Sequence, residues 1–483
     1  MKFEFAFVFA IATVVVACKD DDGASGPRAE LLDPKACEEC HPQHYQQWLG
    51  SMHAYAADDP VFLAMNARGQ RETGGALGDF CVQCHAPVAV ALGATTDGLN
   101  LDEVPQHLKG VTCYFCHNVE QVEGTHNNPL RLAMDDVMRG WFDDAVENDF
   151  HRASYSDLLD GETVASGDMC GSCHDLVNPA GVPVERTYQE WLASFYADPA
   201  ANNPQLVEYY GQSCNDCHMR GSTEPVADYP GVQTRRLRDH RFVGIDVALT
   251  DWPDAEQGPA LAADQREKLQ KFLDPEVCVG LCVNPADEGG TEIKVWLHNE
   301  FAGHNFPSGA AQDRRLWVEL VGYDGDTPVF ESGVVANDAS IDAAANDDPM
   351  LWVLRDFAYK DESASEPAHM FWEIGYIEPN TLEVAPEAGL VYDKTTWKER
   401  IWHVDGPVDR ATVAVKIRPM PFELVDELEA DGLDPAVKDR IPTFTLAESV
   451  REWTPETAVM TDLEGMCVQS ATCFEAISMD DGL

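Results

Sequence analysis

The chain has 483 residues, a hydrophobic content of 45% and a formal net charge of −51, from 33 basic and 84 acidic side chains. This length allows two or three domains, and the hydrophobic fraction is sufficient for a packed core. A surface this acidic repels nucleic acid and anionic lipid headgroups, so no nucleic-acid partner is expected. The acidic residues are spread over every segment, which favours a solvated surface over a patch for one cationic partner.

The first seventeen residues, 1–17, have the pattern of a secretory signal peptide: a lysine, an apolar run and small residues. The ending Val-Val-Ala-Cys resembles a bacterial lipobox, which predicts that Cys18 is the lipidated first residue of the mature chain. The alternative is ordinary signal-peptide cleavage near this position, in which case Cys18 is not lipidated. Residues 18–34 are expected to form a flexible tether. These features predict an extracytoplasmic bacterial lipoprotein, anchored to a membrane through Cys18, on the periplasmic side of the outer membrane or at the cell surface.

Ten of the fifteen cysteines lie in five copies of the pattern Cys-x-x-Cys-His. The two thiols can reach the two vinyl groups of one porphyrin and the histidine can bind its iron, so the pattern predicts covalent haem c. One copy could be a redox dithiol or half of a zinc site, but five copies do not pair into four-ligand zinc sites. The sequence therefore predicts five covalently attached haem c groups. The attachment cysteines are Cys37, Cys40, Cys81, Cys84, Cys113, Cys116, Cys170, Cys173, Cys214 and Cys217, and the proximal histidines are His41, His85, His117, His174 and His218.

Four further cysteines lie after these motifs: Cys278, Cys282, Cys467 and Cys473. In an oxidising compartment they are expected to form two disulfides, for which three connectivities exist. We favour the local pairs Cys278–Cys282 and Cys467–Cys473, and bridges between the two regions are the alternative.

The five motifs leave roughly forty residues for each haem, too few for an ordinary core, so the porphyrins are expected to serve as core. Apolar residues at helical spacing predict helices at 42–56, 187–197 and 263–273. Later segments alternate with a period of two, which is typical of strands in an antiparallel sandwich. These segments are 291–299, 314–323, 369–376 and 409–419.

The predicted fold class is α+β: a haem-packed, mainly α N-terminal multihaem domain followed by an antiparallel β-sandwich domain. The pentahaem domain is expected over residues 35–275 and the sandwich over 285–420. A mixed helical and irregular tail is expected over 421–483, including a short acidic helix at its start.

The segment CHPQHYQQWLGSMH, residues 40–53, resembles the first haem site of the nitrifier tetrahaem cytochrome family, whose members accept electrons from hydroxylamine oxidoreductase. GVTCYFCHNV, CGSCHDLVNPAGVPVERTYQEW and GQSCNDCHM are similar to later sites of such multihaem cytochromes, so the resemblance covers roughly 35–245. In a wider set of multihaem cytochromes a sheet domain follows, with a segment like GHNFPSGAAQDRRLW, residues 303–317. Five motifs instead of four mean that ligand assignments cannot be transferred as a whole.

If every iron binds two histidines, five of the ten histidines outside the motifs are distal ligands. His53 matches the family position after Trp48 and Ser51. The other candidates lie in loops or returning segments that could reach a neighbouring iron, and each could instead be a surface or hydrogen-bonded histidine. The candidate distal ligands are His53, His126, His151, His240 and His304. His44 is expected to face solvent.

The leading hypothesis is electron transfer through closely packed, mostly bis-histidine haems in an extracytoplasmic respiratory chain, with redox proteins as partners and no catalytic residues assigned. The alternative is a reductase of a small nitrogen or sulfur oxide at one five-coordinate haem. Pentahaem nitrite reductases typically carry a Cys-x-x-Cys-Lys site and a helical C-terminal half, and this sequence lacks the first and predicts strands for the second. A haem-containing filament, with the sandwich as assembly surface, is a third hypothesis.

Overall fold

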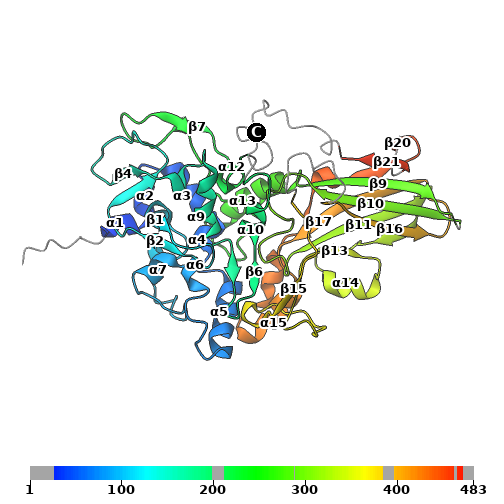
Figure 1. Ribbon diagram of the computed structural model, residues 1–483, viewed down its shortest axis with the longest axis horizontal. Helices are drawn as coiled ribbons and strands as arrows, with labels where there is room; N and C mark the ends of the chain where they lie inside the picture. Colours follow the sequence, from blue (N-terminus) through cyan, green and yellow to red (C-terminus); the bar gives the residue numbers. More distant parts are fainter. Residues whose placement is uncertain (1–26, 198–210, 288, 385–395, 462–464, 471–483) are drawn as a thin grey trace, which may run out of the picture.

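The computed structural model describes residues 27–197, 211–287, 289–384, 396–461 and 465–470 (Figure 1). The signal peptide, the lipobox at Cys18, the start of the tether and Cys473 lie outside these residues, so the expectations for them stay predictions. Within the described ranges, every helix is too short or too polar to cross a bilayer.

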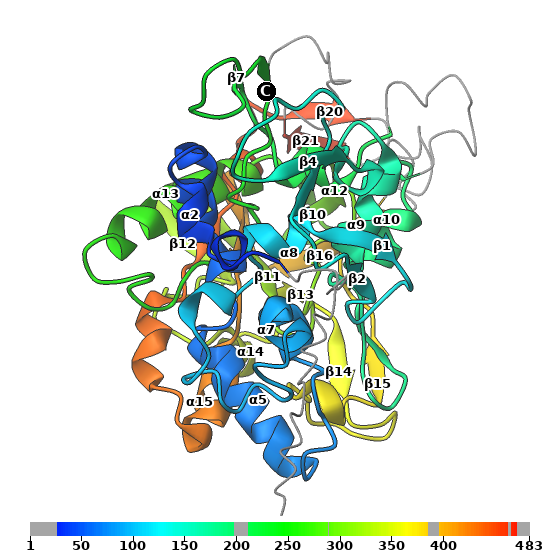
Figure 2. The ribbon, with the colours of Figure 1, turned by 90° about the vertical axis from the view of Figure 1, so that its left-hand side faces the viewer.

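The N-terminal half is built from short helices, as the motif spacing predicts (Figures 1 and 2). The predicted helix at 42–56 is present but is broken at Gly50 and Ser51, and the predicted helix at 187–197 ends at Leu192. The helices are α1 Ala29–Leu32, α2 Pro34–Cys37, α3 Pro42–Leu49, α4 Met52–Tyr55, α5 Pro60–Glu72, α6 Val82–His85, α7 Pro87–Ala91, α8 Cys113–His117, α9 Gly167–Gly171, α10 Thr187–Leu192, α12 Cys214–His218 and α13 Gly258–Leu273.

Proline and capping residues fix where these helices begin. Helices α3, α5 and α7 each have proline in the first turn, where its missing N–H costs no hydrogen bond. Thr112 caps α8 by accepting a hydrogen bond from the Phe115 amide, and Ser213 and Asp216 form a capping box on α12. Two of the five haem motifs are therefore placed on helices with a defined start.

Two-stranded ladders connect the short helices. Strands β1 (Val119–Val122) and β2 (Leu130–Leu132) are antiparallel, whereas β3 (Val137–Gly140) and β4 (Arg152–Tyr155) are parallel. The remaining antiparallel ladders are β5 Leu176–Val177 with β6 Pro183–Glu185, β7 Thr223–Pro225 with β8 Thr234–Arg236, and β14 Phe357–Tyr359 with β15 Tyr376–Glu378.

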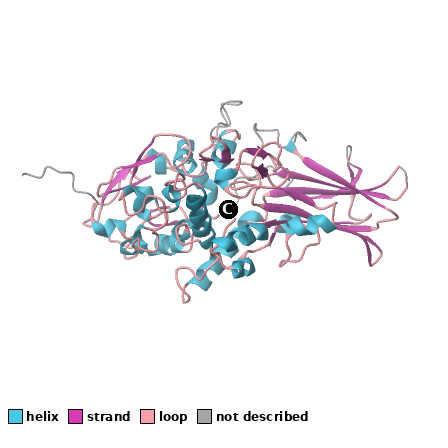
Figure 3. Cartoon of the chain, turned by 90° about the horizontal axis from the view of Figure 1, so that it is seen from below, coloured by secondary structure: helices cyan, strands magenta, loops and turns pink. Residues whose placement is uncertain are grey.

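Two antiparallel sheets form the C-terminal half, at the opposite end of the molecule from the first helices (Figures 1 and 3). One has the order β16-β10-β9-β21-β20; the other has β12-β11-β17-β18, with β13 on β11 and β19 on β17. The strands are β9 Val277–Pro285, β10 Thr291–Asn299, β11 Arg315–Asp324, β12 Thr327–Ser332, β13 Trp352–Leu354, β16 Lys398–Val404, β17 Arg410–Arg418, β18 Phe444–Thr445, β19 Arg451–Trp453, β20 Val459–Thr461 and β21 Gly465–Gln469. Helix α14 (Ile341–Asp347) follows β12.

The two sheets face each other across one apolar core. Leu281 of β9 and Ile293 of β10 belong to the same buried cluster as Leu316 of β11 and Val415 of β17. Buried and half-buried residues alternate along β17, as expected for a strand with one face on a core. The predicted α+β class, helices first and antiparallel sheets second, is confirmed.

The sheets extend beyond the predicted range of 285–420 in both directions. Strand β9 begins at Val277, and β18 to β21 come from 421–483, which was expected to be helical and irregular. These late strands have two to five residues, too few for a period of two to be visible in the sequence. The limits of the pentahaem domain stay a prediction.

The predicted strand at 369–376 is wrong for its central residues, because Phe371–Glu373 form a turn of 3-10 helix. The Asn178 side-chain amide donates to the carbonyl oxygens of Phe371 at 2.9 Å and Ile374 at 2.7 Å. These carbonyl groups are therefore satisfied by a side chain rather than by a neighbouring strand.

The acidic helix expected at the start of the tail is present as α15 (Phe422–Leu428), and it packs against α5 of the N-terminal half (Figures 1 and 2). Val61 and Ala64 of α5 share a buried cluster with Leu424 and Val425 of α15. The last part of the chain thus covers the first, and the two halves share buried surface.

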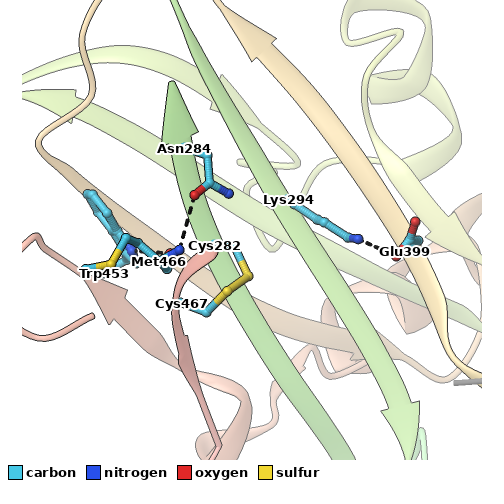
Figure 4. The surroundings of a disulfide bond; sticks show 7 residues. All are labelled: Cys282, Asn284, Lys294, Glu399, Trp453, Met466 and Cys467. Carbon is cyan, nitrogen blue, oxygen red and sulfur yellow. Dashed lines mark hydrogen bonds and ion pairs between the residues drawn. A yellow bond between two sulfur atoms is a disulfide. The ribbon is translucent and has the colours of Figure 1, made fainter. Parts of the chain in front are cut away.

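The favoured disulfide pairing is wrong: Cys282 of β9 is bonded to Cys467 of β21, which are direct neighbours across the ladder with Cα atoms 4.1 Å apart (Figure 4). Cys278 and Cys282 lie four residues apart on one strand, about 13 Å at the usual rise per residue. A disulfide spans at most about 7 Å between Cα atoms, so a strand cannot hold the local pair. Cys278 is also disulfide-bonded.

Removing the Cys282–Cys467 bridge should destabilise the sheets, because the bridge joins positions 185 residues apart and so restricts the unfolded chain. We expect the Cys282→Ser, Cys467→Ser double variant to lose about 2–5 kcal/mol of unfolding free energy. Calorimetric or guanidinium unfolding, followed by far-ultraviolet circular dichroism, measures this loss. An unchanged unfolding midpoint would show that the bridge does not restrict the unfolded chain.

Candidate haem sites

All five Cys-x-x-Cys-His motifs open onto one connected cavity of about 1250 Å³, and every one of their fifteen cysteine and histidine side chains lines it. A site for one small molecule is typically about 300–1,000 Å³, so this cavity is larger than a single-ligand site. None of these ten cysteines is bonded to another cysteine, so all ten sulfur atoms are available for thioether bonds. The donor set of paired thiols and imidazoles fits covalent haem c.

Each motif is wound into one helical turn, which explains its spacing. The backbone amides of His41, His85 and His174 donate to the carbonyl of the first cysteine of their motifs, at 2.8, 3.3 and 3.1 Å. Residues three and four positions apart share one face of a helix, so both cysteines and the histidine point the same way.

Four proximal histidines are oriented by a hydrogen bond from Nδ1 to a backbone carbonyl oxygen of another segment. With Nδ1 engaged, Nε2 is the nitrogen left to bind a metal. The Nδ1 to oxygen distances are 3.2 Å for His41 and Val226, 2.8 Å for His85 and Ala56, 2.5 Å for His117 and Arg139, and 2.6 Å for His218 and Val243. His174 differs: its Nδ1 lies 3.7 Å from the Glu185 carboxylate.

Three candidate distal histidines face a proximal histidine at a similar separation. The ring centroids are 6.3 Å apart for His174 and His53, 6.4 Å for His117 and His240, and 6.2 Å for His218 and His304. Two imidazoles that bind one metal ion from opposite sides at about 2 Å have centroids about 6 Å apart. The structure thus brings these three pairs to the separation that a shared iron requires.

Four of the six paired rings are held in the form that binds a metal, those of His53, His218, His240 and His304. Burial lowers the pKa of His53 to about 3 and that of His218 to about 4, so both imidazoles are neutral at neutral pH. Nδ1 of His240 is engaged by the Arg238 carbonyl at 2.9 Å, and Nδ1 of His304 by the Asn305 carbonyl at 2.7 Å, which leaves Nε2 free in both.

The other two candidate distal histidines differ from each other. His151 lines the cavity, close enough to His41 that its charge, after burial and His44, helps to lower the pKa of His41 to about 4. His126 is exposed, lies outside the cavity lining, and contacts Thr125 at 3.1 Å. The adjacent Asn127 binds the Val177 carbonyl at 2.8 Å, which holds the loop away from the cavity. The structure does not bring His126 to any of the five sites.

His44 does not face solvent as expected. It is half-buried in the cavity wall, with its ring centroid 5.9 Å from that of His41 and 4.7 Å from that of His240. It lies three residues after His41, at the start of α3, and this spacing returns it to the face that carries the first motif.

The second site is lined differently. The His85 ring stacks on Phe62 of α5, with centroids 4.0 Å apart and planes within 7°. Across the described ranges, candidate distal histidines face the proximal rings of the third, fourth and fifth sites at about 6 Å, and no histidine ring lies at that separation from His85.

His304 reaches the fifth site because α10 holds its loop, which connects β10 to β11. The Ser308 hydroxyl donates to Glu190 at 2.6 Å and the Asn305 amide donates to the same oxygen at 3.2 Å. The Gly309 amide donates to the Thr187 hydroxyl at 3.0 Å. Burial raises the pKa of Glu190 to about 7. The sheet half thus supplies a side chain to the cavity of the helical half.

Sequence patterns did not identify Glu185, Glu190 or the carbonyl groups that orient the histidines. Glu185 follows His174 by eleven residues, and only the β5–β6 hairpin brings the two together. A backbone carbonyl carries no sequence signal, so the four Nδ1 contacts required the structure.

Residues 36–118 match a family model described as cytochrome c554 and c-prime. A penta-heme cytochrome c552 from Thermochromatium tepidum has a similar fold, with a TM-score of 0.56 and 19% sequence identity. That similarity covers 88% of this chain and 99% of the other chain. No curated protein matches the sequence.

Replacing His304 should change one haem only. In the His304→Ala variant we expect one iron to lose its sixth ligand, so that electron paramagnetic resonance of the oxidised protein gains a high-spin signal from one haem per chain. The matched control is His403→Ala, because His403 lies on β16 with its side chain 71% exposed. An unchanged low-spin spectrum in His304→Ala would remove the sheet half from the ligand set.

Proposed function

We propose that the chain is a multihaem c-type cytochrome that carries electrons through five haem c groups in an extracytoplasmic respiratory chain, between redox protein partners. The observation that carries the proposal is the continuity of the five sites in one cavity. Bound haem c supplies one-electron redox chemistry. The residues of this chain attach the groups, orient their ligands and exclude water.

Contacts between cysteines of different motifs support a continuous order of sites. The Cys37 side chain lies beside Cys113, the Cys84 side chain beside Cys173, and the Cys170 side chain beside Cys214. Cys116 of the third motif is also close to Cys170 of the fourth. The first site therefore adjoins the third, the third adjoins the fourth, and the fourth adjoins both the second and the fifth.

Histidine pairs at three sites favour electron transfer over catalysis there. An iron with imidazole on both sides has no open position for a substrate, and its ligands need not move when it changes oxidation state. The pairs His174 with His53, His117 with His240 and His218 with His304 would close their irons in this way.

The proposal also includes a relation to one particular cytochrome family and a location outside the cytoplasm. The match at residues 36–118 supports kinship with the nitrifier tetrahaem cytochromes, and a protein redox partner of the kind they use. The signal-like segment and the Cys282–Cys467 disulfide support a site outside the cytoplasm, with the chain held to a membrane through Cys18.

The second candidate function is reduction of a small nitrogen or sulfur oxide at the His85 site. The observation that favours it is the Phe62 ring stacked on His85, whereas the third, fourth and fifth sites present a facing histidine. An iron held at His85 with an open opposite face could bind a small ligand.

Haem content and carbon monoxide binding test both candidates. For an electron carrier we expect five haems per chain by pyridine haemochromogen assay, rapid oxidation of the reduced protein by a single-haem cytochrome, and no turnover of nitrite or hydroxylamine. Turnover of either substrate, together with carbon monoxide binding at about one haem per chain, would overturn the electron-carrier proposal in favour of the reductase. Fewer than five haems would refute the count.

A further inference from the structure

Glu185 sets the fourth haem site apart from the other four. Four proximal histidines donate from Nδ1 to neutral backbone carbonyls. His174 instead has the Oε1 atom of Glu185 at 3.7 Å, an ion-pair separation, and the Glu185 side chain is 15% exposed.

The β5–β6 hairpin fixes Glu185 in this position. Leu176, two residues after His174, is directly opposite Glu185 in the ladder. Asn178 closes the turn by accepting hydrogen bonds from the Ala180 and Val182 amides at 3.0 and 2.9 Å. The contact between Glu185 and His174 is therefore a product of the hairpin and not of a free surface side chain.

A salt bridge ties the ends of the same hairpin together. Arg186 donates to Asp175 at 2.9 Å, and these residues directly follow Glu185 and His174 in the sequence. Val184, on the other side of Glu185, is buried at 2% exposure. The residues on both sides of Glu185 are therefore fixed, Arg186 by its salt bridge and Val184 by burial.

Among the described residues, the Glu185 carboxylate forms no ion pair with a lysine or arginine. Arg314 is a cation whose charge reaches it, but the two Nη atoms of Arg314 are bound by Asp246 at 2.6 and 2.8 Å. Two further carboxylates, Glu190 and Asp175, lie near Glu185, and its charge also reaches His85 of the second motif. The histidine in direct contact with Glu185 is His174, so its negative charge acts most strongly there.

We infer that Glu185 is a positioning residue that lowers the reduction potential of the fourth haem below those of the other four. A negative charge beside the Nδ1 atom of a ligating histidine makes its Nε2 a stronger donor, which favours ferric over ferrous iron. The inference rests on the proposed haem content and adds to it a ranking of the five sites. The site so ranked is the one that adjoins the second, third and fifth sites.

The test is a redox titration of full-length, haem-loaded Glu185→Gln against the unmodified protein, with mediators and visible spectroscopy. Glutamine keeps the size of the side chain and removes its charge. We expect the ratio of reduced to oxidised haem at one centre, the last to be reduced, to rise about tenfold at a fixed solution potential, which corresponds to about 59 mV for one electron. The other four centres should shift by less, the second site most among them because the charge of Glu185 also reaches His85.

Arg186→Gln is the matched control, because it loosens the same hairpin but leaves the carboxylate in place. It also removes a positive charge, which favours ferric iron, so it should not raise the reduction potential of any haem. Glu185→Asp keeps the negative charge on a shorter side chain, so the reduction potential of the fourth haem should rise less than in Glu185→Gln. If the glutamine variant does not fold, this smaller rise in Glu185→Asp is the test.

Three outcomes would overturn the inference: superimposable titrations of Glu185→Gln and the unmodified protein, an equal shift of all five centres, or an equal rise in Arg186→Gln. Absence of the haem c spectrum in the unmodified protein would instead refute the proposed function. The two failures are therefore distinguishable.

Discussion

The hydrogen bond from the Nδ1 atom of a proximal histidine to a distant carbonyl is the contact on which the helical half depends. A Cys-x-x-Cys-His turn fixes where the imidazole begins, but not which nitrogen it presents. Val226 lies 185 residues after His41, and Ala56 comes from the segment before the second motif. Each motif is therefore completed by another part of the chain, so the sites and the fold form together.

The same dependence joins the two halves of the molecule. The sheets have their own apolar core, yet the loop between β10 and β11 places His304 opposite His218, and α10 fixes that loop through Glu190 and Thr187. In return, α15 covers α5. A cavity of this size cannot close from the helical half alone, because several of its walls belong to the segments that follow it.

The sequence predicted the chemistry better than it predicted the geometry. Five copies of a motif with fixed spacing identify attachment sites without any fold, and the alternation along β10, β11 and β17 identifies the sheets. The Cys282–Cys467 pairing was missed because it depends on strand order, and β21 is too short to show a period. His44 was misjudged because a helical position does not by itself say which face the packing of later segments will cover, and His126 because a histidine in a loop carries no signal for where that loop lies.

The contacts between cysteines of different motifs make the order of sites branched rather than linear. The fourth site has three neighbours, so the network has three ends, at the first, second and fifth sites. A linear chain offers two terminal docking positions, and a partner bound at one of them is separated from the other by every intervening centre. In a branched network of haems such as the one proposed, a path between any two ends leaves the third end unoccupied.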